Sequence, residues 1–212
     1  MQLLSLYTKT PFLVVYILMI HNTSEQTKKN AEESLALASA LFPHEEWKPK
    51  GNGIFVAKSR LTGNYKERAK LYREISSIRI LTNLGSVAYF LPEQLNNTNK
   101  GKKCADTVLD GKIVEIKTVS GNRTTLGKSF KKGYKQGLSM IENYPDIKME
   151  HNVFLRLYTP FSVESVRAKI AGELINTSNK GSCICYFEAT EELYSWTYEE
   201  LRAIVNTHIK KP

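Results

Sequence analysis

The chain has 212 residues, of which 42% are hydrophobic and 24% are charged, and its formal net charge is +9. These values are typical of a globular protein with one large domain, or one domain with a small appendage, and the basic excess favours an anionic partner. The three cysteines, Cys104, Cys183 and Cys185, form neither an even disulfide set nor a zinc-binding spacing, so a disulfide scaffold and a zinc protein are excluded and a reducing, cytoplasmic compartment is expected.

The first fifty residues contain an apolar run and a helical pattern. Phe12 to Ile20 is continuously apolar but too short to span a bilayer, so we expect no membrane partner. A buried strand or a start codon upstream of the real domain explains the run, and a signal peptide is not favoured. Thr23 to Phe42 predicts a helix capped by Ser24 or Thr23. The proline- and glycine-rich segment from Pro43 to Gly53 predicts a boundary between an appendage at 1–50 and a main domain at 51–212.

A strand and a long helix open the main domain. Ile54 to Lys58 reads as a strand, and Asn64 with Glu67 three residues later forms a capping-box pattern at the start of a helix. The apolar stripe of that helix consists of Leu71, Ile75, Ile78 and Leu81. Gly85 ends the helix, and Val87 to Leu91 is predicted as the next strand.

Glu74 lies within this apolar stripe, beside Ile75. A carboxylate that points toward a core is costly unless it is paired or binds a metal. Two interpretations stay open: an ion pair with the neighbouring Lys70 or Arg73, or a role in a functional site.

The segment from Cys104 to Lys117 predicts a β-hairpin. Asp110-Gly111 separates two alternating runs, which is the strongest short-range hairpin signal. A two-residue turn pairs Leu109 with Lys112, Val108 with Ile113 and Thr107 with Val114, and it places Asp106 opposite Glu115.

The alternation divides the hairpin into two faces. We expect one face to be polar and the other to pack against the core; the polar face holds Asp106, Val108, Ile113, Glu115 and Lys117. Because two carboxylates that face each other across strands repel, a divalent cation, Mg²⁺ or Mn²⁺, is the natural compensation. Lys117 would position a water or stabilise developing negative charge, although a charged strand face is often only solvated.

Basic residues surround the hairpin. From Lys100 to Gln136 there are ten basic and three acidic residues, so nucleic acid is the leading partner. A helix is predicted from Thr124 or Thr125 to about Tyr144, with Phe130, Tyr134, Leu138 and Ile141 as its apolar stripe. Its cations and amide on an adjacent face, together with a cation just before it, are candidates for nucleic-acid binding: Arg123, Lys128, Lys131, Lys135 and Gln136.

Strands and helices alternate to the end of the chain. The remaining predicted elements are a strand at Val153 to Tyr158, a helix at Val163 to Ile175, a strand at Cys183 to Glu188 and a helix at Tyr198 to His208.

This order of elements and motifs resembles the PD-(D/E)xK nuclease superfamily. Its strings Ala105-Asp106, Asp110-Gly111-Lys112, Glu115-Ile116-Lys117-Thr118 and Lys131-Lys132-Gly133-x-Lys135-Gln136 resemble the tRNase domains at the C-termini of bacterial contact-dependent inhibition toxins. The resemblance covers roughly Gly51 to Ile204 and includes Leu193 to Trp196.

The resemblance implies an α/β (α+β) fold with a mixed central sheet flanked by helices and a restriction-endonuclease-like αβββαβ core. It implies Asp106, Glu115 and the Ile116 backbone carbonyl as ligands of Mg²⁺ or Mn²⁺ and Lys117 as the catalytic lysine. Glu74 would complete the metal site, with Lys135 and Gln136 beside it.

The expected function is metal-dependent hydrolysis of phosphodiester bonds in RNA, most simply tRNA, by a toxin-type nuclease with a neutralising immunity-type partner and no small-molecule cofactor. Three alternatives stay open. They are a DNA endonuclease of the same fold, a non-catalytic nucleic-acid-binding module, and an interaction protein for which Phe12 to Ile20 is an interface.

Overall fold

A computed structural model describes residues 24–93, 105–175 and 177–209 of the chain. Its elements form a mixed eight-stranded sheet, in the spatial order β1 to β8, with helices on both faces. The expected α/β fold class is confirmed. The apolar run from Phe12 to Ile20, with its candidate strand, lies outside the described residues. Among the helices that are described, none is long and apolar enough to cross a membrane.

The elements follow one another in the chain with strands and helices interspersed. The strands are β1 (Trp47–Pro49), β2 (Ile54–Ala57), β3 (Ala88–Phe90), β4 (Thr107–Leu109), β5 (Lys112–Val119), β6 (His151–Leu157), β7 (Gly181–Phe187) and β8 (Glu192–Thr197). The described helices are α2 (Ser24–Leu41), α3 (Lys58–Leu61), α4 (Tyr65–Thr82), α5 (Arg123–Asn143), α6 (Val163–Glu173) and α7 (Tyr198–Ile209). The run α4, β3, β4, β5, α5, β6 has the αβββαβ order expected for the core.

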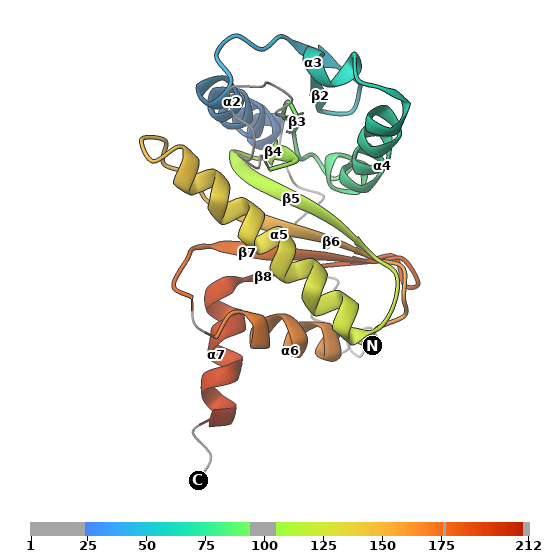
Figure 1. The fold of residues 1–212 in the computed structure, drawn as a ribbon, viewed down its shortest axis with the longest axis vertical. Helices are drawn as coiled ribbons and strands as arrows, with labels where there is room; N and C mark the ends of the chain where they lie inside the picture. The colour runs from blue at the N-terminus through green and yellow to red at the C-terminus, as the bar shows by residue number, and fades with distance from the viewer. Residues whose placement is uncertain (1–23, 94–104, 176, 210–212) are drawn as a thin grey trace, which may run out of the picture.

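The sheet is covered on both faces. Helix α4 packs its apolar stripe on one face of β2 to β5, and α5 crosses β5 and β6 on the other, with α6 and α7 beside it (Figure 1). The four apolar residues predicted for α4 are all buried. The capping box at Asn64 is formed as predicted, since its side chain accepts from the Glu67 amide and the Glu67 carboxylate accepts from the Asn64 amide.

The part of the chain before residue 51 joins the same sheet and core. β1 pairs with β2 in an antiparallel register, and residues 51–53 lie in the turn between these strands. Ala38 and Leu41 of α2 are buried against β3, β4 and α5. The boundary expected at residue 51 therefore falls inside a β-hairpin and does not correspond to a break in packing among the described residues.

The hairpin between β4 and β5 has the predicted register. Asp110 and Gly111 have φ angles of 47° and 73°, the left-handed conformations that a type I′ turn requires. Thr107 pairs with Val114, Val108 with Ile113 and Leu109 with Lys112. The Asp110 carboxylate also accepts a hydrogen bond of 2.8 Å from the Val87 amide, which ties the turn to the start of β3.

The hairpin face predicted to be polar is buried as well, so the alternative of a merely solvated face is wrong. Val108 and Ile113 are completely buried in a cluster with α2 and α5, and the side chain of Glu115 is 1% exposed. The reason is that α5 covers this face and α4 covers the other. Glu115 is therefore a buried acid under a helix, not a surface acid.

Close packing of α5 on the sheet depends on glycines. A Cβ atom at Gly133 would lie 3.4 Å from Glu115 Cγ and 3.5 Å from Lys117 Cγ, and a Cβ at Gly137 would lie 2.7 Å from His151 Nδ1. Because neither position carries a side chain, the helix backbone lies directly over the stems of Glu115 and Lys117 at Gly133 and over His151 at Gly137.

Replacing Gly137 by alanine is expected to destabilise the fold by about 1 to 3 kcal/mol, because the new methyl group overlaps the ring of the buried His151. Gly172→Ala is the matched control, since nothing lies within 4 Å of a Cβ at that helical position, and we expect a gain of about 0.5 to 1 kcal/mol there. Urea unfolding of the two variants measures both effects, and a Gly137→Ala protein as stable as wild type would contradict the close approach.

Candidate active site

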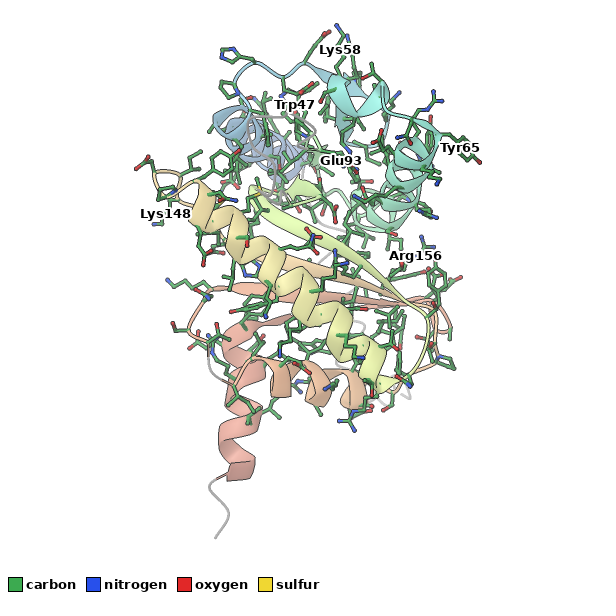
Figure 2. All side chains as sticks on the ribbon, viewed as in Figure 1. Trp47, Lys58, Tyr65, Glu93, Lys148 and Arg156 are labelled. Atoms are coloured by element: carbon green, nitrogen blue, oxygen red, sulfur yellow. The ribbon has the colours of Figure 1, made fainter. Side chains whose placement is uncertain are left out.

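Four acidic side chains and three basic ones meet beside the start of β4, where β5 continues beyond it. They come from α3, α4, the segment after β3, the residue before β4, and β5. Figure 2 labels one of them, Glu93. The seven residues are Arg60, Lys70, Glu74, Glu93, Asp106, Glu115 and Lys117, and we call them the carboxylate cluster.

Asp106 and Glu115 form the centre of this cluster. Asp106 directly precedes β4, and its Oδ2 accepts a hydrogen bond of 2.8 Å from the backbone amide of Ile116. Burial first, and then the negative charge of Asp106, raise the pKa of the Glu115 carboxyl from 4.5 to about 8. The two carboxylates thus interact strongly, as the register of the hairpin predicts.

Lys117 lies on the same face of β5 as Glu115. Its ammonium group donates to Glu115 Oε1 and, at 3.2 Å, to the carbonyl oxygen of Ile116. The other oxygen of Glu115, Oε2, is buried and has no hydrogen-bond partner among the described residues. Since buried carboxylate oxygens are normally satisfied, this oxygen is open to one further cationic or donor group.

Glu74 points into the cluster and not to solvent. Its Oε2 accepts from the Arg60 guanidinium at 2.7 Å, and its Oε1 lies 3.4 Å from Lys70 Nζ. Burial first, and then Asp106, raise the pKa of Glu74. The structure therefore brings Glu74 close to the predicted site, but both of its oxygens already face cations.

Three members of the cluster were not singled out by sequence reasoning as site residues. Arg60 is 6% exposed and joins Glu74 to Glu93, while its NH1 donates to the Asp106 backbone carbonyl at 3.3 Å. Lys70 lies 2.8 Å from Glu93 and 3.8 Å from Asp106. The (i, i+4) spacing of Lys70 and Glu74 is a sequence signal, whereas nothing local marks Arg60 or Glu93.

The donor atoms of the cluster fit a divalent metal in part. No group of three or more His, Cys, Asp or Glu side chains within the described ranges has a metal-holding arrangement. Asp106, the free Glu115 Oε2 and the Ile116 carbonyl are hard oxygen donors of the kind that Mg²⁺ prefers. In an extended strand the N–H and C=O of one residue point to the same edge, so the Ile116 carbonyl faces the edge at which its amide meets Asp106. Glu74, held by Arg60, does not fit as a ligand.

The balance of charge in the cluster agrees with this fit. Four carboxylates face three cations, so the cluster is one positive charge short when every group is ionised. A proton on Glu115 or an additional cation would supply that charge. The raised pKa of Glu115 is the expected consequence in the protein without metal.

A cleft of about 320 Å³ opens beside the cluster, between α4 and β5. Its wall includes the ammonium-bearing Lys70 and Lys117, so a ligand in the cleft reaches two of the cluster's cations. The lining residues are Lys70, Arg73, Glu74, Ser77, Ile116, Lys117 and Thr118.

The predicted nucleic-acid-binding residues of α5 do not line this cleft. Lys128, Lys131 and Lys135 are exposed along the outward side of α5, where Lys131 lies 3.9 Å from Glu173 of α6. Arg123, at the start of α5, lines a separate shallow pocket against α6. Gln136 is half-buried, and its Oε1 has no hydrogen-bond partner among the described residues.

Helix geometry places Lys132 nearer the cluster than the predicted lysines. Gly133 faces Glu115 and Lys117, Gln136 lies about 60° to one side of it, and Lys132 lies about 100° to that same side. Tyr134 lies on the other side and packs in the hydrophobic core that α5 forms with α6 and α7. Lys132, missing from the predicted binding set, therefore lies on the flank of α5 that faces the strand edge at Asp106.

Fold and site together define a mixed α/β protein with a buried pair of acids and a lysine at the edge of a central strand. Comparisons of the chain with protein-family models, with curated proteins and with solved structures found no match. The interpretation of the site therefore depends on its geometry and on the residue patterns of the chain.

Proposed function

We propose that this chain is a metal-dependent endonuclease that hydrolyses phosphodiester bonds in RNA, with tRNA as its substrate. The observation that carries the proposal is the juxtaposition of Asp106, Glu115 and Lys117 at one strand edge, with an unpartnered Glu115 oxygen beside an open cleft. The basic composition of the chain and its resemblance to toxin tRNase domains support RNA as the substrate.

In this proposal Asp106, Glu115 and the Ile116 carbonyl hold Mg²⁺ or Mn²⁺. The metal, when bound, supplies a water of lowered pKa and stabilises charge on the scissile phosphate. With Glu115 neutralised by the metal, Lys117 would be free to donate to a phosphate oxygen or to the attacking water. Glu74 and Arg60 act together as a positioning pair, since Arg60 holds both Glu74 and the backbone carbonyl of Asp106.

Two alternatives to this proposal are distinguished by a single experiment. DNA is the alternative substrate for the same chemistry. A non-catalytic nucleic-acid-binding module is favoured by one observation, namely that cations of the chain itself occupy both oxygens of Glu74 and one of Glu115.

Purified protein incubated with tRNA and with plasmid DNA, in Mg²⁺ or in EDTA, tests these outcomes. We expect tRNA cleavage that requires Mg²⁺ and is lost in Asp106→Asn, because this change removes a charged ligand while it retains an oxygen that can accept from the Ile116 amide. Glu150→Gln is the matched control at an exposed acid that pairs with Lys112. Cleavage of plasmid alone would assign DNA, and binding without cleavage in every condition would contradict an enzyme.

A further inference from the structure

Two of the most exposed large side chains of the described protein are tyrosines on α4. Tyr65 is 79% exposed and Tyr72 is 63% exposed. They are seven residues apart, so they lie on the same flank of the helix, about 10.5 Å from each other along its axis. Figure 2 shows Tyr65 projecting away from the body of the molecule. Packing among the described residues does not account for these rings.

Cations without acidic partners alternate with the two rings. Arg68 lies three residues after Tyr65 and four before Tyr72, so it stands between them on this flank. The exposed basic residues of α4 that have no ion pair within the described residues are Lys66, Arg68, Arg73 and Arg79. The acids of α4 are engaged elsewhere, Glu67 in the capping box and Glu74 in the carboxylate cluster.

A third exposed tyrosine continues the row toward the sheet. Tyr158, just after β6, is 49% exposed, and the Arg156 guanidinium lies 5.2 Å from the centre of its ring. Arg156 also donates at 3.2 Å to Ser76 Oγ, one helical turn after Tyr72, and its Nε donates to the Glu188 carboxylate, which holds the guanidinium in place. Figure 2 places Arg156 at the side of the molecule below α4. The three rings and Arg156 therefore form one surface, which we call the tyrosine strip.

The tyrosine strip adjoins the mouth of the cleft. Arg73, next to Tyr72 in the chain, and Ser77, next to Ser76, both line the cleft together with Lys117. A ligand that lies along the strip thus extends toward the carboxylate cluster without crossing another element.

The chemistry of the strip favours single-stranded nucleic acid. The guanidinium groups of Arg68 and Arg73, which have no acidic partner within the described residues, can neutralise phosphates, and exposed aromatic faces stack with bases that are not paired in a duplex. An acidic protein surface would pair with the same cations. It would not explain why two isolated rings, two helical turns apart, are exposed to solvent. Duplex nucleic acid hides its base faces, so it gains nothing from the rings.

We propose that the tyrosine strip of α4, Arg156 and Tyr158 is a stacking platform for single-stranded nucleic acid, which leads the strand into the cleft. The second half of this inference rests on the proposed function, because it takes the cleft as the place of cleavage. The platform itself is a binding site and is measurable without turnover.

Fluorescence anisotropy with a labelled 12-nucleotide oligo-U and with a labelled RNA duplex, both in EDTA, tests the platform. The Tyr65→Ala/Tyr72→Ala double variant is expected to bind oligo-U at least about tenfold more weakly and the duplex unchanged. The matched Tyr65→Phe/Tyr72→Phe variant keeps both rings and is expected to bind as wild type. Circular dichroism confirms that the variants fold, since both side chains are exposed.

Wild-type binding of oligo-U by the double alanine variant, or an equal loss for single strand and duplex, would overturn the platform. The two proposals separate by their readouts, since the platform is tested by oligo-U binding in EDTA and the nuclease by cleavage in Mg²⁺. Ring-dependent binding without any cleavage in Mg²⁺ would leave the platform standing and remove the nuclease. Cleavage that is unaffected by loss of both rings would leave the nuclease standing and remove the platform as the route into the cleft.

Discussion

Substituting glutamine for Glu115 is expected to abolish cleavage and, in metal-free protein, to stabilise the fold at pH 8. The loss of activity is expected to be at least about 100-fold, since the change removes a charged metal ligand and the partner of Lys117. The gain in stability follows from the cost of ionising a carboxyl that is 1% exposed and faces Asp106.

The pH dependence has a definite direction. The pKa of Glu115 is about 8 in the folded protein against 4.5 for an ordinary glutamate, so the folded state retains a proton that the unfolded chain has released. The stabilisation from this group is complete below pH 4.5 and is lost as the pH rises to 8. Glutamine does not titrate, so the variant gains roughly 2 to 4 kcal/mol relative to wild type between pH 5 and pH 8.

Urea unfolding of both proteins in EDTA at pH 5 and pH 8 measures this difference. Glu74 and Asp110, whose pKa values are also raised by burial, titrate in both proteins, and the comparison therefore isolates Glu115. Glu150→Gln, at an exposed position, is expected to show no such change. A stability difference between Glu115→Gln and wild type that is the same at both pH values would contradict a buried, destabilising acid.

Removal of the Arg60 guanidinium is expected to cost about 3 to 5 kcal/mol of stability, because it leaves the buried carboxylate of Glu74 without its closest partner. Arg60→Leu makes this change. The double variant Arg60→Leu/Glu74→Leu is expected to recover most of the loss, since a buried ion pair replaced by apolar side chains is often neutral. Lys58→Leu, two residues earlier in α3 at an exposed pair with Glu46, is the control and is expected to leave the unfolding midpoint almost unchanged.

Activity separates the two roles of Arg60. If Arg60 positions Asp106 through its backbone carbonyl, the double variant regains stability but not the cleavage rate. Full recovery of both would mean that the ion pair only stabilises the fold. Equal stability of Arg60→Leu and wild type would contradict the buried network.

The parts of the fold that sequence predicts well are those specified by neighbouring residues. Asp110-Gly111 supplies the two left-handed conformations of the turn, and the turn alone determines that Asp106 lies across from Glu115. The capping box of Asn64 and Glu67 likewise acts within one helical turn and marks the start of α4. These signals do not depend on the rest of the chain.

The parts that sequence does not predict depend on distant contacts. The short strand β1 and the four-residue helix α3 carry too few residues for a periodic pattern, and β8 buries only Trp196 among its six residues. Arg60 became part of the site only because α3 lies against Glu74, Glu93 and Asp106.

The burial of Glu115 illustrates the same limit. Strand alternation places Glu115 and Lys117 on one face but does not say what covers that face. Gly133, which weakens a helix as a residue type, is the position at which α5 approaches both side chains. The unpartnered oxygen of the buried Glu115 is therefore visible only in the structure.

The rate of tRNA cleavage by Lys117→Ala, measured in Mg²⁺ beside Lys112→Ala, tests the central claim most directly. Both lysines lie on β5 and both pair with a glutamate, but only Lys117 contacts Glu115 and the cleft. We predict a loss of at least about 100-fold for Lys117→Ala and a wild-type rate for Lys112→Ala. Equal rates for Lys117→Ala and wild type would contradict the assignment of this strand edge as a nuclease active site.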